Sequence, residues 1–309
     1  MDVAFPATIS LSQKSIKRHL RSPATAYRPG AEQSGVMRSF LRSFFGSLGV
    51  HAQGERAGGR EPPSAPDGVC LYAIGDVHGE RRCLERLLAV IARDAEEHRV
   101  EDGLQPLLVF LGDYVDRGPD SRGVLDLLCA RAAASAAGTG PACRFLLGNH
   151  EAAMLDFLRN PADGAEWLSY GGAEALASYG VRASVGIVSA ARCRTLRDSL
   201  EERLPEEHRA FLESLEPMAV LGDYAFVHAG IRPGVPLERQ RLEDLLWIRE
   251  PFLSSPRPHG KVVVHGHTVT DVPQILPNRI GLDTGAYATG VLSAVALHGT
   301  HRRILQSRA

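Results

Sequence analysis

The chain has 309 residues, of which 44% are hydrophobic, so it can bury a sizeable core in one large or two ordinary domains. Its 35 lysines and arginines nearly balance 36 aspartates and glutamates, and this formal net charge of -1 gives no reason to expect a nucleic-acid or membrane partner. The sequence lacks a run of roughly 18 apolar residues, so no transmembrane segment is predicted. Five scattered cysteines without a CxxC pair argue against a disulfide framework and favour a cytoplasmic location.

The first part of the chain is predicted to be a flexible extension and linker at residues 1–66, ahead of a folded domain at 67–309. Residues 1–36 are rich in Ser, Arg, Ala and Pro and show no apolar period. Apolar residues recur at helical spacing over 40–48, which predicts a short helix. Met37 offers a second translation start, which we state as a hypothesis.

The folded domain opens with strands and helices in alternation. Apolar runs predict strands at residues 69–74, 107–111 and 145–147. Leucines at helical spacing predict helices at 80–98 and 124–137. Such alternation favours an α/β layered sheet.

The second half of the chain differs in character. Residues 152–215 read as mostly helical and are predicted to form an inserted helical cap, in which aromatic residues belong mainly to the core. Further strands are predicted at 225–228, 261–265, 280–283 and 291–297, as a second and more antiparallel layer.

Polar side chains follow five of the predicted strands at the point where each strand ends. Because strand ends can converge on one edge of a sheet, these side chains are expected to form one site. The motifs read GDVHG from residue 75, GDYVDRG from residue 112, GNHE from residue 148, VHAG from residue 227 and HGHT from residue 265.

The residue types in these motifs predict a dinuclear metal site. Asp76 and His78 lie two positions apart on extended backbone, so both can face one cation. Asp113 can bridge two cations, since a carboxylate has two oxygens. A donor set of oxygen and nitrogen without thiolate favours Mn²⁺, with Fe and Zn²⁺ as alternatives. The remaining predicted ligands of the second cation are Asn149, His228 and His267.

Together the motifs resemble those of the calcineurin-like metallophosphoesterases, and more closely the PPP-type serine/threonine phosphoprotein phosphatases of the bacterial and phage kind. The resemblance covers roughly residues 69–298. It implies an α/β fold in which a layered β-sandwich is flanked by helices (α/β/β/α), with the helical cap inserted at 152–215. It also implies that 67–309 is the catalytic domain.

The same resemblance implies a role for each motif residue. Asp76, His78 and Asp113 would hold the first metal, and Asp113 would share the second with the three ligands already named. His150 matches the family's general acid, and Asp116 matches the carboxylate that orients it. Two arginines match phosphate-binding positions, with Asn149 also near the phosphate. These arginines are Arg117 and Arg249, while His265 matches an extra histidine outside the metal shell.

The reaction implied is the single-step hydrolysis of phosphoserine and phosphothreonine esters by a hydroxide that bridges the two metals. Asp116 favours this substrate class, because the related symmetrical diadenosine tetraphosphate hydrolases tend to lack an aspartate there. Residues 282–286 replace the SAPNYC-like segment of eukaryotic PPP enzymes, which points to a bacterial-type enzyme.

Two alternatives remain open at this stage. One is a symmetrical bis(5'-nucleosyl)-tetraphosphatase, with capped RNA ends as a further substrate, and the other is a metal-binding scaffold without turnover. The expected partner is therefore a phosphoprotein or phosphopeptide, or else a dinucleoside polyphosphate. The oligomeric state is not predicted.

Overall fold

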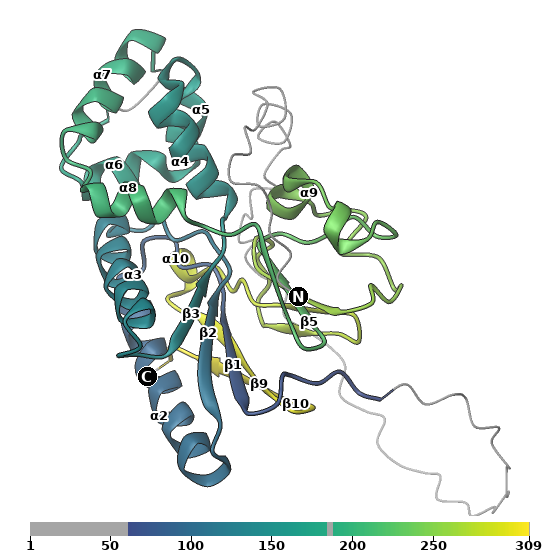
Figure 1. The fold of residues 1–309 in the computed structure, drawn as a ribbon. Helices are drawn as coiled ribbons and strands as arrows, with labels where there is room; N and C mark the ends of the chain where they lie inside the picture. Colours follow the sequence, from purple (N-terminus) through teal and green to yellow (C-terminus); the bar gives the residue numbers. More distant parts are fainter. Residues whose placement is uncertain (1–60, 184–187, 309) are drawn as a thin grey trace, which may run out of the picture.

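The computed structural model describes residues 61–183 and 188–308, and Figure 1 shows their arrangement. Residues 1–60 of the predicted extension, including the helix at 40–48 and Met37, lie outside the described residues. None of the helices within the described ranges is long and apolar enough to cross a membrane.

Two five-stranded sheets form the centre of the molecule. The first has the strand order β10-β9-β1-β2-β3 and the second has the order β4-β5-β6-β8-β7. Parallel pairs join β1 to β2 and β2 to β3, and also β5 to β6 and β6 to β8. The strands are β1 Val69–Ile74, β2 Gln105–Phe110, β3 Ala142–Phe145, β4 Met218–Leu221, β5 Tyr224–Val227, β6 Val262–His265, β7 Gln274–Ile275, β8 Arg279–Gly281, β9 Ser293–His298 and β10 His301–Gln306.

The last predicted strand, at residues 291–297, was assigned to the wrong layer. In the structure β9 pairs antiparallel with β1 and thus returns to the first sheet. β10 then pairs antiparallel with β9 and forms the edge of that sheet. The antiparallel character expected in the second layer is limited to its outer pairs, β4 with β5 and β7 with β8.

Helices cover the first sheet and extend beyond its upper edge in Figure 1. The longest helix, α2, turns its leucines toward the core and ends at Gly103, whose φ of 70° is the left-handed conformation common after helices. The helices are α2 Arg81–Asp102, α3 Ser121–Ala136, α4 Asn149–Arg159, α5 Ala165–Trp167, α6 Ala173–Ser178, α7 Ala190–Glu201, α8 Glu206–Glu213, α9 Leu242–Trp247 and α10 Ala286–Thr289.

The alternation of side chains along β1 explains why the sheets stack. Leu71 and Ala73 point between the two sheets, where they pack with Phe226 and Val264 from the second sheet. The intervening residues, including Tyr72, join the core under the helices. A sheet that is buried on both faces needs continuous apolar strands, and β1 has that composition. The layered sandwich flanked by helices is confirmed.

The segment from α4 to α8 lies beyond the ends of β1, β2 and β3 (Figure 1). Its described residues form helices and loops, as predicted for 152–215. A π-helix at Leu168–Gly172 interrupts the helices and includes Gly171, whose φ is 112°. This interruption turns the chain back toward the strand ends.

Part of the predicted linker is attached to the folded body. The backbone N–H of Ser64 donates to Asp223, and that of Ala65 donates to the carbonyl of Gly299 at 2.8 Å. Ala65 is only 4% exposed. Ser64 and Ala65 are thus bound to the folded body. All five cysteines are free, as expected without a disulfide framework.

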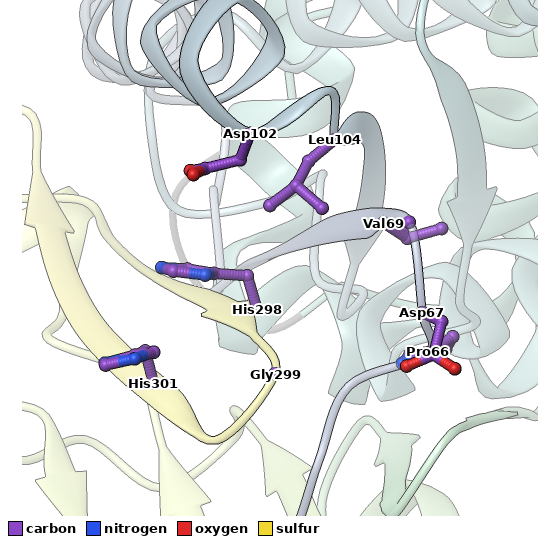
Figure 2. A pocket seen from close by; sticks show the side chains of 9 residues that line it. Pro66, Asp67, Val69, Asp102, Leu104, His298, Gly299 and His301 are labelled. Carbon is purple, nitrogen blue, oxygen red and sulfur yellow. The ribbon is translucent and has the colours of Figure 1, made fainter.

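A cavity of about 390 Å³ lies at the amino-terminal end of β1 (Figure 2). Its lining includes Asp67, Val69 and Asp102 together with His298 and His301 of the β9–β10 hairpin. The motif residues follow the carboxyl end of β1 instead. The cavity is thus at the opposite edge of the sheet from the predicted site.

Candidate active site

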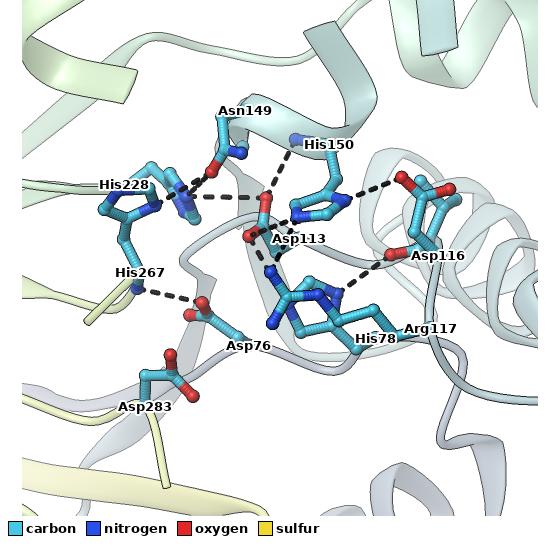
Figure 3. A network of polar contacts seen from close by, with 12 residues as sticks. Asp76, His78, Asp113, Asp116, Arg117, Asn149, His150, His228, His267 and Asp283 are labelled. Carbon is cyan, nitrogen blue, oxygen red and sulfur yellow. Dashed lines mark hydrogen bonds and ion pairs between the residues drawn. The ribbon is translucent and has the colours of Figure 1, made fainter. Parts of the chain in front are cut away.

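The five motifs meet at the carboxyl ends of β1, β2, β3, β5 and β6, as the sequence predicts. Figure 3 shows their side chains converging on Asp113. All of the predicted metal ligands are buried, with exposures of 8% or less. Buried carboxylates and imidazoles from separate strands have to be compensated by one another or by bound ions.

Asp113 lies between two histidines. Its Oδ2 atom is 3.5 Å from Nε2 of His78, and its Oδ1 atom is 3.4 Å from Nε2 of His228. The Nδ1 atoms of these histidines face the backbone carbonyls of Val115 and Leu111, at 3.1 and 2.9 Å. A carbonyl at Nδ1 leaves Nε2 free to bind a metal.

Asn149 joins the second pair of histidines. Its Oδ1 atom is 2.8 Å from Nε2 of His228 and 2.9 Å from Nδ1 of His267. The backbone N–H of His267 donates to Oδ2 of Asp76 at 2.8 Å, which ties the β6 loop to the β1 loop. Asp76 therefore reaches the site beside His267.

In this site, two groups of three side chains have the spacing needed to hold cations. In each group one donor atom per residue lies within 4.8 Å of the others, and both groups include Asp113. The first group joins Asp113 to His78 and His150, and the second joins it to His228 and His267. The structure thus places His150, the predicted acid, in a possible ligand group with Asp113. Asp76, a predicted ligand, belongs to neither group.

The electrostatics of the site also fit bound cations. Burial raises the pKa of Asp76 well above its ordinary value, and the nearby carboxylates of Asp283 and Asp113 raise it further. Oδ1 of Asp76 and Nε2 of His267 are buried without a hydrogen-bond partner among the described residues. Two divalent cations would neutralise the three carboxylates and occupy these free atoms. The donor set therefore fits the predicted dinuclear centre.

Strained backbone conformations bring the ligands to this position. His78, Asp113 and His267 have φ angles of 46°, 51° and 63°, which residues other than glycine rarely adopt. Asp116 and Arg117 are also left-handed, with φ angles of 73° and 67°. Such strain persists only where the surrounding structure enforces it, and it is common at functional sites.

Glu151 enforces the conformation of the Asp113 loop. Its Oε2 atom accepts hydrogen bonds from the backbone N–H groups of Asp113 and Gly148, at 2.8 and 3.0 Å. Its Oε1 atom accepts from those of Tyr114 and Val115, at 2.7 and 3.1 Å. The side chain is fully buried. The sequence analysis included Glu151 in the GNHE motif but gave it no role.

His150 and Asp116 form the predicted pair. Nδ1 of His150 donates to Oδ2 of Asp116 at 2.6 Å, and both side chains are buried. Burial lowers the pKa of His150, but the carboxylates of Asp113 and Asp116 outweigh burial and raise it. The indole N–H of Trp167 donates to the same Asp116 oxygen at 2.8 Å. The sequence analysis treated Trp167 only as an aromatic core residue.

The two predicted arginines are placed differently. A guanidinium nitrogen of Arg117 is 3.3 Å from Nε2 of His150, and its guanidinium carbon lies 4.8 Å from the centre of the Tyr287 ring. Arg249 is exposed, and partial desolvation together with the charge of Arg117 lowers the pKa of its guanidinium. Two cations that repel each other beside the Asp113 cluster can hold an anion. Tyr287 was missed by the sequence analysis.

His265 points away from the metal ligands. Its ring packs against Phe252 with centroids 5.1 Å apart, and Nε2 lies 3.4 Å from Arg279. Burial lowers its pKa to about 4. This placement agrees with the expectation that His265 does not bind a metal.

A helix-flanked β-sandwich with a histidine and carboxylate cluster at its strand ends defines the class of the metallophosphoesterases. The sequence model of the calcineurin-like phosphoesterase family matches residues 71–289. The chain belongs to this family. Members of the family use a dinuclear divalent metal site, and the residues described above could hold one.

Several curated relatives are named as dinucleoside tetraphosphatases. The symmetrical bis(5'-nucleosyl)-tetraphosphatase of Methylococcus capsulatus is 30% identical over 165 residues, which are 53% of this chain and 44% of the relative. The asymmetrical enzyme PrpE of Geobacillus thermodenitrificans is 25% identical over 242 residues, covering 72% of this chain and 88% of the relative. The chain spans about half the length of the symmetrical relatives it matches first.

A solved structure supports the fold. The crystal structure of a proposed diadenosine tetraphosphatase superimposes with a TM-score of 0.52 and is 23% identical, covering 79% of this chain and 98% of the other. At this identity the likeness applies to the fold alone.

Proposed function

We propose that this protein hydrolyses phosphoserine and phosphothreonine monoesters. The observation that carries the proposal is the buried contact of 2.6 Å between His150 and Asp116, next to the shared ligand Asp113. A serine or threonine alkoxide is a poor leaving group that needs a proton as it departs, whereas a nucleotide leaves as a stable phosphate anion. An imidazole oriented by a carboxylate supplies that proton, so the pair matches the harder leaving group.

The other residues of the site are assigned by their positions. Arg117 and Arg249 hold the phosphoryl oxygens, and the Asn149 side chain lies beside them. Mn²⁺ is the proposed metal. When bound, two such cations lower the pKa of a water molecule and neutralise charge that develops on the phosphoryl group. The proposed metal ligands are Asp76, His78, Asp113, Asn149, His228 and His267.

We assign catalysis to residues 67–309, with 152–215 as the cap beside the site. The phosphoprotein or phosphopeptide substrate and the cytoplasmic location follow from the sequence and stay predictions. A cap that lies beyond the strand ends is placed where it can select among substrates.

Hydrolysis of dinucleoside polyphosphates is the second candidate. It is favoured by the names of the curated relatives, both symmetrical and asymmetrical. Identities of 25–30% support a shared fold and chemistry more strongly than a shared substrate. The same cations and arginines would suit a polyphosphate chain, so the pair of His150 and Asp116 is what separates the two candidates.

A product assay tests the choice. Purified protein is loaded with Mn²⁺ and offered a phosphothreonine peptide and diadenosine tetraphosphate side by side, with His150→Asn and the remote His301→Asn as paired controls. The proposal expects faster phosphate release from the peptide, lost in His150→Asn and retained in His301→Asn. Preferential release of ADP, or of AMP with ATP, would instead assign the chain to nucleotide hydrolysis. Absence of either product from metal-loaded protein would support the scaffold alternative.

A further inference from the structure

One oxygen of Asp116 has two partners that come from different parts of the chain. Oδ2 accepts a hydrogen bond from Nδ1 of His150 at 2.6 Å and another from the indole N–H of Trp167 at 2.8 Å. Trp167 ends α5 in the cap and is 4% exposed. The cap therefore contributes a donor directly to the pair that delivers the proton.

The indole is held firmly in this orientation. Its ring packs on Phe157 of α4 with centroids 4.6 Å apart. Gly172 also packs so closely against the indole that a Cβ atom there would lie 2.5 Å from the indole carbons. Gly164 likewise leaves room for Phe157, since a Cβ atom would lie 2.3 Å from that ring. A donor fixed by such packing can fix the group that accepts from it.

The neighbouring residue of the catalytic loop is attached to the same part of the cap. The backbone N–H of Arg117 donates to the carbonyl of Gly171 at 3.1 Å. Gly171 has a φ of 112°, and a Cβ atom there would lie 2.6 Å from the nitrogen of Arg117. The π-helix and Trp167 thus hold two consecutive residues, Asp116 and Arg117.

Asp116 has few other constraints on its side chain. Its backbone N–H donates to Ser121, which fixes the main chain. Its second carboxylate oxygen, Oδ1, is buried and has no hydrogen-bond partner among residues 61–183 and 188–308. Among the described residues, His150 and Trp167 alone therefore hold the carboxylate plane by hydrogen bonds. Without the indole N–H, the carboxylate could rotate about its bond to Cβ, and the imidazole would tilt with it.

We propose that Trp167 is a positioning residue, through which the cap holds Asp116 and His150 in the geometry for proton delivery. The inference rests on the proposed function, because it needs His150 as the acid. It predicts that the effect of Trp167 depends on how much the leaving group needs a proton. A merely structural tryptophan would affect all substrates alike.

The test compares two esters in Trp167→Phe, which keeps an aromatic ring and removes the donor. For a phosphothreonine peptide, kcat should fall roughly 10-fold with KM changed less than about 2-fold, since general acids contribute about 10²–10⁴ in rate. For p-nitrophenyl phosphate, whose leaving group needs little protonation, kcat should stay within about 2-fold. The matched control is Tyr179→Phe, which loses the 2.8 Å contact of a buried cap hydroxyl with His208 and should leave both rates unchanged.

A double variant tests whether Trp167 acts through Asp116. Trp167→Phe should add no further loss in an Asp116→Asn background, because the carboxylate that it orients is already gone. If Trp167→Phe does not fold, a variant with benzothienylalanine at position 167 takes its place in every assay. This residue keeps the bicyclic shape of the indole and lacks the N–H donor.

The outcomes separate this inference from the proposed function. Equal losses for both esters in Trp167→Phe, or no loss for the peptide, would overturn the positioning role while His150→Asn still shows the expected leaving-group dependence. If His150→Asn itself lacks that dependence, the acid assignment fails and the role of Trp167 fails with it.

Discussion

At the scale of single residues, Asp113 is the side chain on which the site depends most. It belongs to both groups of possible ligands, and the histidines on either side are oriented toward it by backbone carbonyls of their own. Asp76 and Asp283 add negative charge that no described arginine or lysine pairs at hydrogen-bond distance. Bound cations would therefore balance the charge of this part of the protein.

Substitution of a residue that belongs to both ligand groups should lower the metal content more than substitution of a residue that belongs to one. Asp113→Asn removes a charge from both metal positions, so we expect it to bind less than half the Mn²⁺ of the wild type. His267→Asn should lose about one equivalent of two, because His267 belongs to one group only. Metal content after dialysis measures this. Two retained equivalents in Asp113→Asn would contradict the bridging role.

At the scale of elements, the start of α4 determines the conformation of the Asp113 loop. Glu151 accepts from four backbone N–H groups of two loops, which offsets the strain of the left-handed residues nearby. The GNHE motif thus places the proposed ligand Asn149, the proposed acid His150 and the loop-holding Glu151 on three consecutive helical residues.

Replacing Glu151 should destabilise the whole site. In Glu151→Gln one carboxylate oxygen is replaced by an NH₂ group, which faces two backbone N–H groups and cannot accept from them. Each of these two N–H groups is left without an acceptor, which costs about 1–3 kcal/mol of stability. We expect a loss of about 2–6 kcal/mol in the free energy of unfolding, measured by urea denaturation. The exposed Glu202→Gln should change little. Wild-type stability in Glu151→Gln would show that the four hydrogen bonds are dispensable.

The attachment of α8 to α3 and α6 predicts a pH dependence of stability. His208 contacts Asp126 of α3 at 2.9 Å and Tyr179 next to α6 at 2.8 Å. Burial lowers its pKa below the ordinary value of 6.5, although Asp126 and Glu207 oppose the shift. The unfolded chain therefore binds a proton more readily, and the folded state should lose stability as the pH falls below 6.5.

Urea unfolding of wild type and His208→Gln, at about pH 7.5 and about pH 5.5, checks this dependence. The wild type should lose more stability on acidification than the variant, which cannot take up the proton. A loss of the same size in both proteins would assign the pH effect to other groups.

At the scale of the whole molecule, the sandwich positions the site by directing five strand ends to one edge. The sequence allowed this edge and its ligands to be predicted because each motif is local: an apolar strand, a glycine and a polar residue within a few positions. His265 was set apart from His267 by the resemblance to the family's HGHT motif and not by the local pattern. The pairing of β9 with β1 could not be predicted, since sheet order depends on contacts between residues far apart in the chain.

Contacts from the cap were missed for the same reason. Trp167 meets Asp116 across 51 positions. Outside the cap, Tyr287 approaches Arg117 from α10, which is also far from it along the chain. Nothing in the local sequence distinguishes a tryptophan that only packs from one that also donates to a catalytic carboxylate. The hydrogen bond from the backbone N–H of Arg117 to Gly171 likewise depends on the fold.

The most direct test of the account is the leaving-group dependence of His150→Asn, measured together with its metal content. With two equivalents of Mn²⁺ retained, kcat for an alkyl phosphate such as a phosphothreonine peptide should fall about 10²–10⁴-fold, and that for p-nitrophenyl phosphate much less. Such a result would assign proton delivery to His150. Unchanged turnover of the peptide, or equal losses for both esters with metal retained, would contradict that role and the proposed function built on it.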